Sequence, residues 1–318
     1  MSPTVDVIIV TRDRSHLIGK AVESVLTAAT PQTMVTIVDQ SSDSATAEVV
    51  GHFCAQDERV VYLPIESKGS SLARNAGIAE TSGQFVLFTD DDCVVAGDWV
   101  TSMIAEFDMS SSSAVFGALR GGDTDRPEGA AAAPWLGVAV TSATERIEFA
   151  PNTTDLGFGH GANMGFRRTA LDEVNNFDPM LGVGCALRSW PERDIGFRLL
   201  RSGHRISFTP SSVVQHNQWR SWDDVYAAHR NYAFGAGAAA AKYVRCREWK
   251  GLRVLRDWLV HLGVRQIVSG VIRWRDPRKV RIGLIDLFYP ALGAWRSRSV
   301  PIDREHCQYL DRRTSEAE

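Results

Sequence analysis

Three consecutive aspartates follow the apolar segment FVLFT and are the residues of this chain best suited to chemistry. Asp90, Asp91 and Asp92 have no lysine or arginine beside them in the sequence, so their carboxylates repel one another unless a positive group lies on them. Carboxylate oxygens favour Mg²⁺ or Mn²⁺, and these cations commonly bind phosphate-bearing substrates. A polar turn after a buried strand is the simpler interpretation, but the pattern favours a metal-assisted phosphate site.

Apolar strand-like segments alternate with helix-like segments through the first hundred residues. Strands are predicted over residues 5–10, 34–39, 59–65 and 84–89, and helices over 16–28, 44–55 and 71–80. This alternation predicts an α/β fold in which helices flank a mostly parallel, Rossmann-like central sheet. Ligands of such sheets bind at the carboxyl ends of the strands. The ends of the first two strands, at Thr11, Arg12, Asp13 and Asp39, should therefore line the same crevice as the aspartates.

Two cations precede the aspartate strand. Lys68 and Arg74 lie in KGSSLARNAG and could neutralise a diphosphate that the metal also contacts. Lys68 could equally be a solvated loop lysine. Asp39 could likewise serve only to cap the turn after its strand.

The middle of the chain is less regular, and the last third is helical and basic. The pattern predicts a surface loop over 121–134, a strand entering a helix over 161–168, a loop over 177–194, a short helix over 195–203 and strands over 205–210 and 212–216. From about residue 218 the pattern is helical, and the terminal segment DRRTSEAE is expected to be disordered.

The chain resembles the family 2 glycosyltransferases of the GT-A fold. The resemblance rests on six blocks in the family's order and spacing, across roughly residues 4–217: DVIIVTRDR, IVDQSSD, KGSSLARNAG, FVLFTDDDC, GANMGFRR and PERDIGFRLLRSGHRISFTP. It implies a GT-A catalytic domain over residues 1–217, followed by a basic helical region over 218–318.

The resemblance also implies roles for individual residues. The expected nucleotide-sugar-binding residues are Thr11, Arg12, Asp13, Asp39, Lys68, Arg74, Asn75, Asp90 and Asp91. The expected metal ligands are Asp92, Asp90 and His216, although a lone histidine is often structural. The acceptor and sugar pocket is expected at His160, Gly161, Asn163 and Trp190, where Trp190 either stacks on a sugar ring or anchors its loop.

The catalytic base departs from the family pattern. Family members carry a Glu-Asp pair whose Asp lies six residues before an arginine, and counting back from Arg198 gives Glu192, preceded by Pro191. We predict Glu192 as the general base and Asp194 as the second choice, because a helix N-terminus favours an ionised carboxylate. Alternatively, both are only the N-terminal charges of a helix.

The implied reaction is an inverting transfer of a sugar from a nucleotide-diphospho-sugar to a hydroxyl of a glycan or lipid-linked acceptor. UDP or TDP is favoured if Asp39 accepts from a ring N–H, and GDP stays compatible. A nucleotidyltransferase would show a Gly-rich loop near the first strand, which TRDRSHLIG lacks. An aspartate-nucleophile phosphatase would show a DxD motif at the first strand, and Asp6 and Asp13 do not form one. A degenerate member that only binds sugars or partners is the remaining alternative.

Composition and charge limit the partners and the cellular location that can be expected for the protein. The 318 residues carry a net charge of −3, which argues against general nucleic-acid binding. Five scattered cysteines indicate free thiols, and no signal peptide or membrane-spanning run is recognised, so a cytoplasmic location is expected. Residues 240–298 contain 14 Lys or Arg against four Asp or Glu, and four of the nine tryptophans. This region predicts either a peripheral contact with an anionic inner membrane face or an ordinary helical subdomain.

Overall fold

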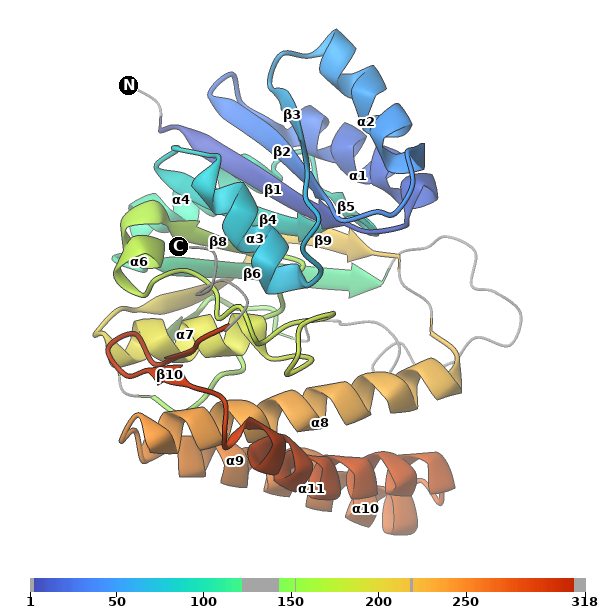
Figure 1. The fold of residues 1–318 in the computed structure, drawn as a ribbon, viewed down its shortest axis with the longest axis vertical. Coiled ribbons are helices and arrows are strands. Elements are labelled where there is room, and N and C mark those ends of the chain that lie inside the picture. The colour runs from blue at the N-terminus through green and yellow to red at the C-terminus, as the bar shows by residue number, and fades with distance from the viewer. Residues whose placement is uncertain (1–2, 122–142, 152, 218–219, 312–318) are drawn as a thin grey trace.

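The computed structural model describes residues 3–121, 143–151, 153–217 and 220–311. A nine-stranded sheet forms its centre, with the strand order β3-β2-β1-β4-β8-β6-β9-β5 and with β7 paired to β9 (Figure 1). The strands are β1 Val5–Thr11, β2 Thr33–Asp39, β3 Val60–Pro64, β4 Phe85–Asp90, β5 Cys93–Val95, β6 Ala114–Gly121, β7 Ile147–Phe149, β8 Met164–Arg167 and β9 Ile206–His216. The fold-class prediction is confirmed.

The parallel strands β1, β2 and β4 end at the edge of the sheet that carries the polar side chains. β1 lies between β2 and β4 with all three strands parallel, and the register places Thr11 beside Asp39 and Val10 beside Asp90. β1 and β2 are rich in β-branched residues, and both are mostly buried on their two faces, as expected for a sheet covered on both sides. Because parallel strands end at one edge, Thr11, Asp39 and Asp90 are brought together there.

Helices bury the two faces of the sheet in separate cores. One face packs against α1 Ser15–Ala28, α2 Ala45–Gln56 and α4 Trp99–Met109. The other packs against α3 Ser70–Ala79, α6 Arg168–Glu173, α7 Pro191–Arg201 and α8 Trp222–Arg245. Two predicted elements have different bounds in the structure. The helix predicted over 195–203 starts earlier, at Pro191, and the strands predicted over 205–210 and 212–216 are one strand, β9. The predicted loop over 121–134 falls, apart from Gly121, outside the described residues.

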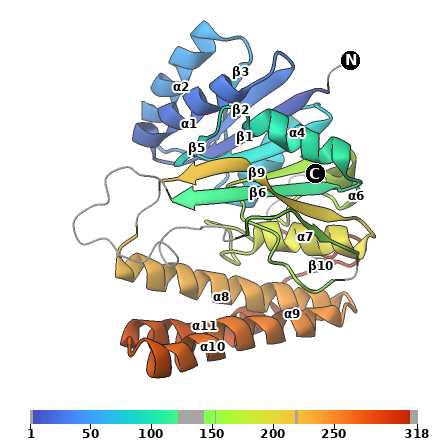
Figure 2. The ribbon, with the colours of Figure 1, turned by 180° about the vertical axis from the view of Figure 1, so that it is seen from behind.

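The C-terminal region forms a second layer of helices. After α8 come α9 Lys250–Trp258, the π-helix η1 Leu259–Val264, α10 Arg265–Val268, the π-helix η2 Ser269–Arg273 and α11 Pro277–Ser297. Both views show α8 between the sheet and these later helices (Figures 1 and 2). Two glycines allow the close approach of α8 and α11, since a Cβ at Gly237 or Gly293 would collide with the backbone of the opposite helix. Among the described residues, no helix has both the length and the apolarity to cross a bilayer.

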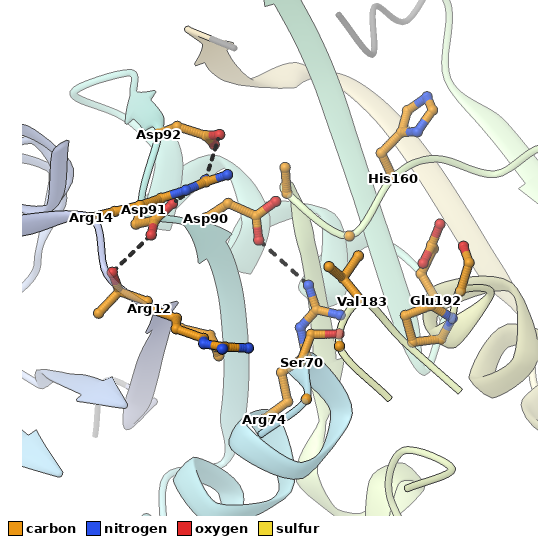
Figure 3. Close-up of a pocket in the computed structure, with 18 of the residues that line it drawn as sticks. Arg12, Arg14, Ser70, Arg74, Asp90, Asp91, Asp92, His160, Val183 and Glu192 are labelled. Atoms are coloured by element: carbon orange, nitrogen blue, oxygen red, sulfur yellow. Dashed lines mark hydrogen bonds and ion pairs between the residues drawn. The ribbon is translucent and has the colours of Figure 1, made fainter. Parts of the chain in front are cut away.

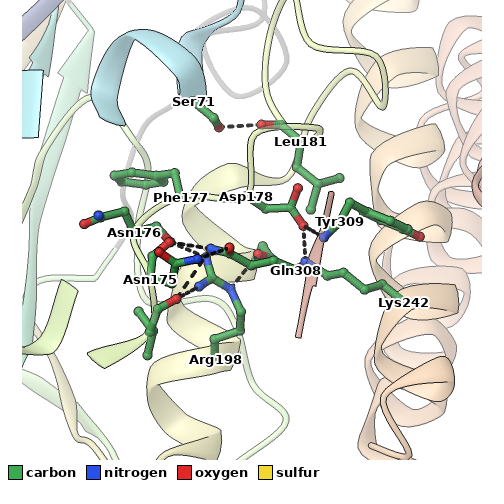
Figure 4. A network of polar contacts seen from close by, with 12 residues as sticks. Ser71, Asn175, Asn176, Phe177, Asp178, Leu181, Arg198, Lys242, Gln308 and Tyr309 are labelled. Carbon is green, nitrogen blue, oxygen red and sulfur yellow. Dashed lines mark hydrogen bonds and ion pairs between the residues drawn. The ribbon is translucent and has the colours of Figure 1, made fainter. Parts of the chain in front are cut away.

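The helical region shares its core with the sheet. Ala236, Ala239 and Tyr243 of α8 belong to the same buried cluster as the residues of α7. A short hairpin, β10 Ile302–Asp303 and β11 Gln308–Tyr309, returns beside α7, where the Tyr309 N–H donates to Asp178 (Figure 4). The boundary at residue 217 stays a prediction, and the buried contacts cross it.

Candidate active site

A cavity of about 420 Å³ opens at the carboxyl ends of β1 and β4. Its walls come from the strand ends, from the start of α3, from the loop before α7 and from α7 itself. The predicted residues that line it are Thr11, Arg12, Arg74, Asp90, Asp91, Asp92, His160, Gly161, Glu192 and His216. Figure 3 shows the aspartates on one side of this cavity and His160 with Glu192 on the other.

The three aspartates have partly different partners, and Arg14 is shared by Asp91 and Asp92. Asp91 accepts hydrogen bonds from the Thr11 hydroxyl at 2.8 Å and from Nη1 of Arg14 at 2.9 Å. Burial raises the pKa of Asp91 to about 6, although the Arg14 charge acts in the opposite direction. Burial acts on Asp92 too, but its hydrogen bond and charge interaction with His216 outweigh burial, and the pKa of Asp92 is lowered. Asp92 is therefore the carboxylate of this cluster most firmly held in the ionised form.

A divalent cation fits the corner formed by Asp92 and His216. Nε2 of His216 lies 3.2 Å from Oδ1 of Asp92, and both side chains are buried at the cavity wall. Cys93 is the third group nearby, but burial and the adjacent aspartates raise the pKa of its thiol, which stays protonated and donates to Asp92 at 3.7 Å. Carboxylate oxygen and imidazole nitrogen suit Mn²⁺ or Mg²⁺ better than a protonated thiol does. Asp92 and His216, with Asp90 beside them, would hold the cation.

The opposite end of the aspartate cluster is cationic. Arg74, on α3, is mostly buried, and its Nη2 lies 3.5 Å from Oδ1 of Asp90 (Figure 3). The N-terminus of α3 also faces the cavity, through Gly69 and Ser70. Gly69 has φ +142°, and a Cβ there would collide with the Cys185 sulfur, so the turn into α3 requires glycine. A helix N-terminus and arginine side chains together suit a phosphate group.

Glu192 supplies the carboxylate on the far side of the cavity. It is the second residue of α7, after Pro191 and a Trp190 N-cap whose φ of +86° turns the chain sharply into the helix. Its side chain is half-buried and lines the cavity, whereas Asp194, two residues on, is fully buried. The Glu192 carboxylate thus lies across the cavity from Arg74 and the N-terminus of α3, which together form a pocket suited to a phosphate.

The family model for "Glycosyl transferase family 2" matches residues 6–174, which is more than half of the chain. The chain belongs to glycosyl transferase family 2. GlyA of Streptococcus pneumoniae is 28% identical over 99 residues, 31% of this chain and 14% of that protein. The pre-mycofactocin glycosyltransferase of Mycobacterium tuberculosis is 26% identical over 201 residues, 62% of this chain and 39% of that protein. The chain thus spans less than half the length of these curated relatives.

The fold of this glycosyl transferase is also found in a solved structure. The mannosyltransferase PcManGT of Pyrobaculum calidifontis, solved with GDP-Man and Mn²⁺, aligns with a TM-score of 0.63 at 15% identity. The alignment covers 94% of this chain and 89% of PcManGT, so it includes the C-terminal helices. At this identity the likeness establishes the GT-A fold alone.

Sequence reasoning missed several side chains of the transferase cavity. Arg14 binds both Asp91 and Asp92, and it stands in the TRDR segment that already supplied Arg12 and Asp13. Tyr232 of α8 and Arg220 just before that helix also line the cavity, and Arg220 donates to the Tyr232 hydroxyl at 3.1 Å. A polar residue at the end of the first strand was a usable signal for Arg14, whereas nothing local marked Tyr232.

Four predicted donor-site residues of the glycosyl transferase do not line the cavity. Asp39 is buried beside Thr11 and accepts from the Tyr62 hydroxyl and from the Ser41 N–H, both at 2.8 Å. The Asp13 carboxylate accepts from Ser42. Lys68 is exposed on the loop before Gly69, and Asn75 bonds in both directions with the backbone of Phe177.

Three further predicted site residues do not line the cavity. Asp194 is wrong as a base, because it is enclosed between Nε of Arg198 at 2.9 Å and Nζ of Lys242 at 2.6 Å. Asn163 is fully buried and braces the sheet through Trp99, Ala118 and Ser212, so it forms no part of the pocket surface. Trp190 packs edge-to-face on Trp258, with 5.1 Å between the ring centroids, which fits the loop-anchor alternative stated for it above.

His160 provides a direct check on the electrostatics of the transferase cavity. Burial, reinforced by the Arg193 charge, lowers the pKa of His160 to about 4. We expect the ring of His160 to be neutral at pH 7 and able to accept a hydrogen bond from a sugar hydroxyl. An NMR pH titration, with His160→Gln to assign the resonance, should give a midpoint near pH 4. A midpoint near the ordinary value of 6.5 would contradict this.

Proposed function

We propose that this glycosyl transferase moves a sugar from a nucleotide-diphospho-sugar to a hydroxyl of a glycan or lipid-linked acceptor, with inversion at the anomeric carbon. The observation that carries the proposal is Glu192, which faces the phosphate-type pocket of Arg74 and Asp90 across the cavity. An inverting displacement needs a base on the side opposite the leaving group, and this arrangement supplies one.

The residues of the chain divide the work of this reaction. Glu192 takes the proton from the acceptor hydroxyl, whose oxygen forms the new bond to the anomeric carbon as the bond to the diphosphate breaks. Arg74 and Arg12, with the N-terminus of α3, bind the departing diphosphate and stabilise its negative charge. A divalent cation held by Asp92 and His216 would add Lewis-acid stabilisation of the same leaving group.

The proposal leaves the nucleotide open and takes the biological role from the family. Asp39 accepts hydrogen bonds from its own chain, so a pyrimidine ring N–H would have to share that carboxylate. UDP, TDP and GDP are therefore all candidates for the nucleotide. We assign a role in cell-surface polysaccharide assembly on family analogy.

Nucleotide binding with and without metal tests the donor site. A diphosphate present at about 100 times its Kd should raise the free energy of unfolding by about 2.7 kcal/mol. We expect one of UDP, TDP and GDP to do so with Mn²⁺ or Mg²⁺, and chelator to reverse the effect. The Asp92→Asn variant should lose the metal-dependent part, because the cation loses its ionised ligand. Thermal shift and calorimetry measure both quantities.

Asp108→Asn is the matched control, since it makes the same chemical change at an exposed position of α4. It should leave the metal-dependent shift intact. Absence of binding for all three diphosphates would refute the donor assignment. Binding without any sugar transfer or donor hydrolysis would support the alternative of a non-catalytic sugar-binding member.

A further inference from the structure

The outermost helices of the C-terminal region expose two apolar stripes. On the helix that runs from α9 to η2, the stripe consists of Val260, Val264, Val268 and Ile272. On α11 it consists of Leu284, Phe288, Leu292 and Trp295. Ile272 is 74% exposed and Phe288 is 69% exposed, which is unusual for side chains of this size. These eight residues are called the outer stripes below.

The outer stripes do not face the core of the chain. The opposite face of α11 is already used, because Ile282 and Ile285 pack on Val225 and Tyr226 of α8. A third face of α11 packs on the preceding helix, where Gly263 and Gly283 meet so closely that a Cβ on either would collide with the other helix. With these contacts made, the helices lie as a layer on the far side of α8 from the sheet (Figures 1 and 2).

The charge around the outer stripes has a single sign. Between residues 249 and 298, all of which are described, every exposed charged side chain is an arginine. These are Arg253, Arg256, Arg265, Arg273, Arg275, Arg278, Arg281, Arg296 and Arg298. The three aspartates of the segment are half-buried or buried, and they are Asp257, Asp276 and Asp286.

Tryptophans mark the ends of this surface. Trp274 and Trp295 are more than half exposed, and each lies under a guanidinium, from Arg273 at 5.2 Å and Arg298 at 4.6 Å. Tryptophan prefers the level of lipid headgroups, and arginine binds lipid phosphates there. An apolar stripe, a rim of arginines and exposed tryptophans together match the interface of an anionic bilayer.

We propose that the outer stripes dock this glycosyl transferase on the surface of an anionic lipid bilayer. The helices lie in the headgroup region with the stripes inserted and the arginines on lipid phosphates. No helix of the described residues is able to span the bilayer, so the contact is peripheral. An ordinary subdomain packing surface would leave acidic and basic side chains mixed on its exposed face.

Docking through the outer stripes would bring the cavity close to the bilayer surface. Tyr232, on α8, lines the same cavity as Glu192, and α11 of the outer layer packs on that helix. One helix, about 10 Å in diameter, therefore separates this wall of the cavity from the docking layer. Resting on the function proposed above, this favours a lipid-linked acceptor that reaches Glu192 from the bilayer surface.

Vesicle co-sedimentation of the full chain tests the docking. The vesicles are phosphatidylcholine alone, and an equal mixture of phosphatidylcholine and phosphatidylglycerol, each at low and high salt. We expect binding to the anionic vesicles that weakens at high salt. The double variant Ile272→Glu/Phe288→Glu should bind at least about tenfold more weakly, because it puts acidic groups into both stripes.

Met109→Glu is the matched control, because Met109 of α4 is also 74% exposed but lies outside the C-terminal region. It should sediment like the parent chain, and melting curves should show that all variants fold. No binding to anionic vesicles, or equal binding to both vesicle types, would overturn the proposal. So would a dimer that the double variant converts to monomer without any vesicle binding, since the stripes would then belong to a second copy. Nucleotide shifts measured on the same samples, without lipid, report separately on the donor site.

Discussion

The Glu192→Gln variant is expected to lose sugar transfer by a factor of about 10²–10⁴ while it keeps its affinity for the nucleoside diphosphate. The amide has nearly the shape of the carboxylate but cannot take the proton of the acceptor hydroxyl. Glu192 lies across the cavity from Arg74 and the aspartates, so donor binding should not depend on it. Product formation from a panel of nucleotide-sugars, together with calorimetry of the diphosphate, measures both quantities.

Two comparisons make this result specific to the base. Glu66→Gln changes an exposed glutamate outside the cavity lining and should leave transfer unchanged. Asp194→Asn should act on stability, since Asp194 is buried between Arg198 and Lys242. If the Glu192 variant retained transfer at the parent rate, the assignment of the base would fail even where donor binding is intact.

The predictions that succeeded depend on patterns that are local in the sequence. The strands, the helices that follow them and the aspartates at the end of β4 can be recognised from a few neighbouring residues. Parallel pairing then brings Thr11 and Asp90 to one edge without further information, because parallel strands end together. For this reason the aspartate edge of the cavity could be predicted from the sequence, whereas Asp13, Asp39, Lys68 and Asn75 were predicted at the site and do not line the cavity.

The side chains that the sequence leaves undecided depend on contacts between distant parts of the chain. Glu192 and Asp194 are two residues apart in α7, so their side chains point about 200° apart around the helix. One must therefore face the cavity and the other the core, and sequence alone does not say which. The choice is fixed by Lys242, 48 residues beyond Asp194, which fills the core side. Tyr232 enters the cavity from the same distant helix, and no local pattern predicted that.

Lys242 of α8 is a buried ionic link between the C-terminal helices and the part of the chain that contains the sheet. Its side chain is completely buried, and Nζ lies 2.5 Å from Asp178 (Figure 4) and 2.6 Å from Asp194. Burial alone would lower the pKa of Lys242, but the two aspartates outweigh it and the pKa is raised, so the lysine is charged in the folded protein. Asp178 also accepts from the Tyr309 N–H, which ties the terminal hairpin to the same centre.

Replacing Lys242 by methionine should therefore destabilise the whole chain. The Lys242→Met variant removes the charge but nearly keeps the volume, and it leaves Asp178 buried without its cation. Breaking a buried ion pair on one side costs about 3–5 kcal/mol, because the remaining charge stays desolvated. Urea unfolding at pH 7 measures the loss, and Lys20→Met on the exposed side of α1 is the control, with an expected change within about 0.5 kcal/mol.

A second variant separates charge from packing. Lys242→Met/Asp178→Asn removes the orphaned carboxylate as well, and it should recover part of the stability lost in the single variant. Recovery would show that the uncompensated charge, and not a cavity, causes the loss. A loss below about 1 kcal/mol in Lys242→Met would contradict the role of this ion pair. The α8 helix would then be held mainly by the apolar contacts of Ala236, Ala239 and Tyr243.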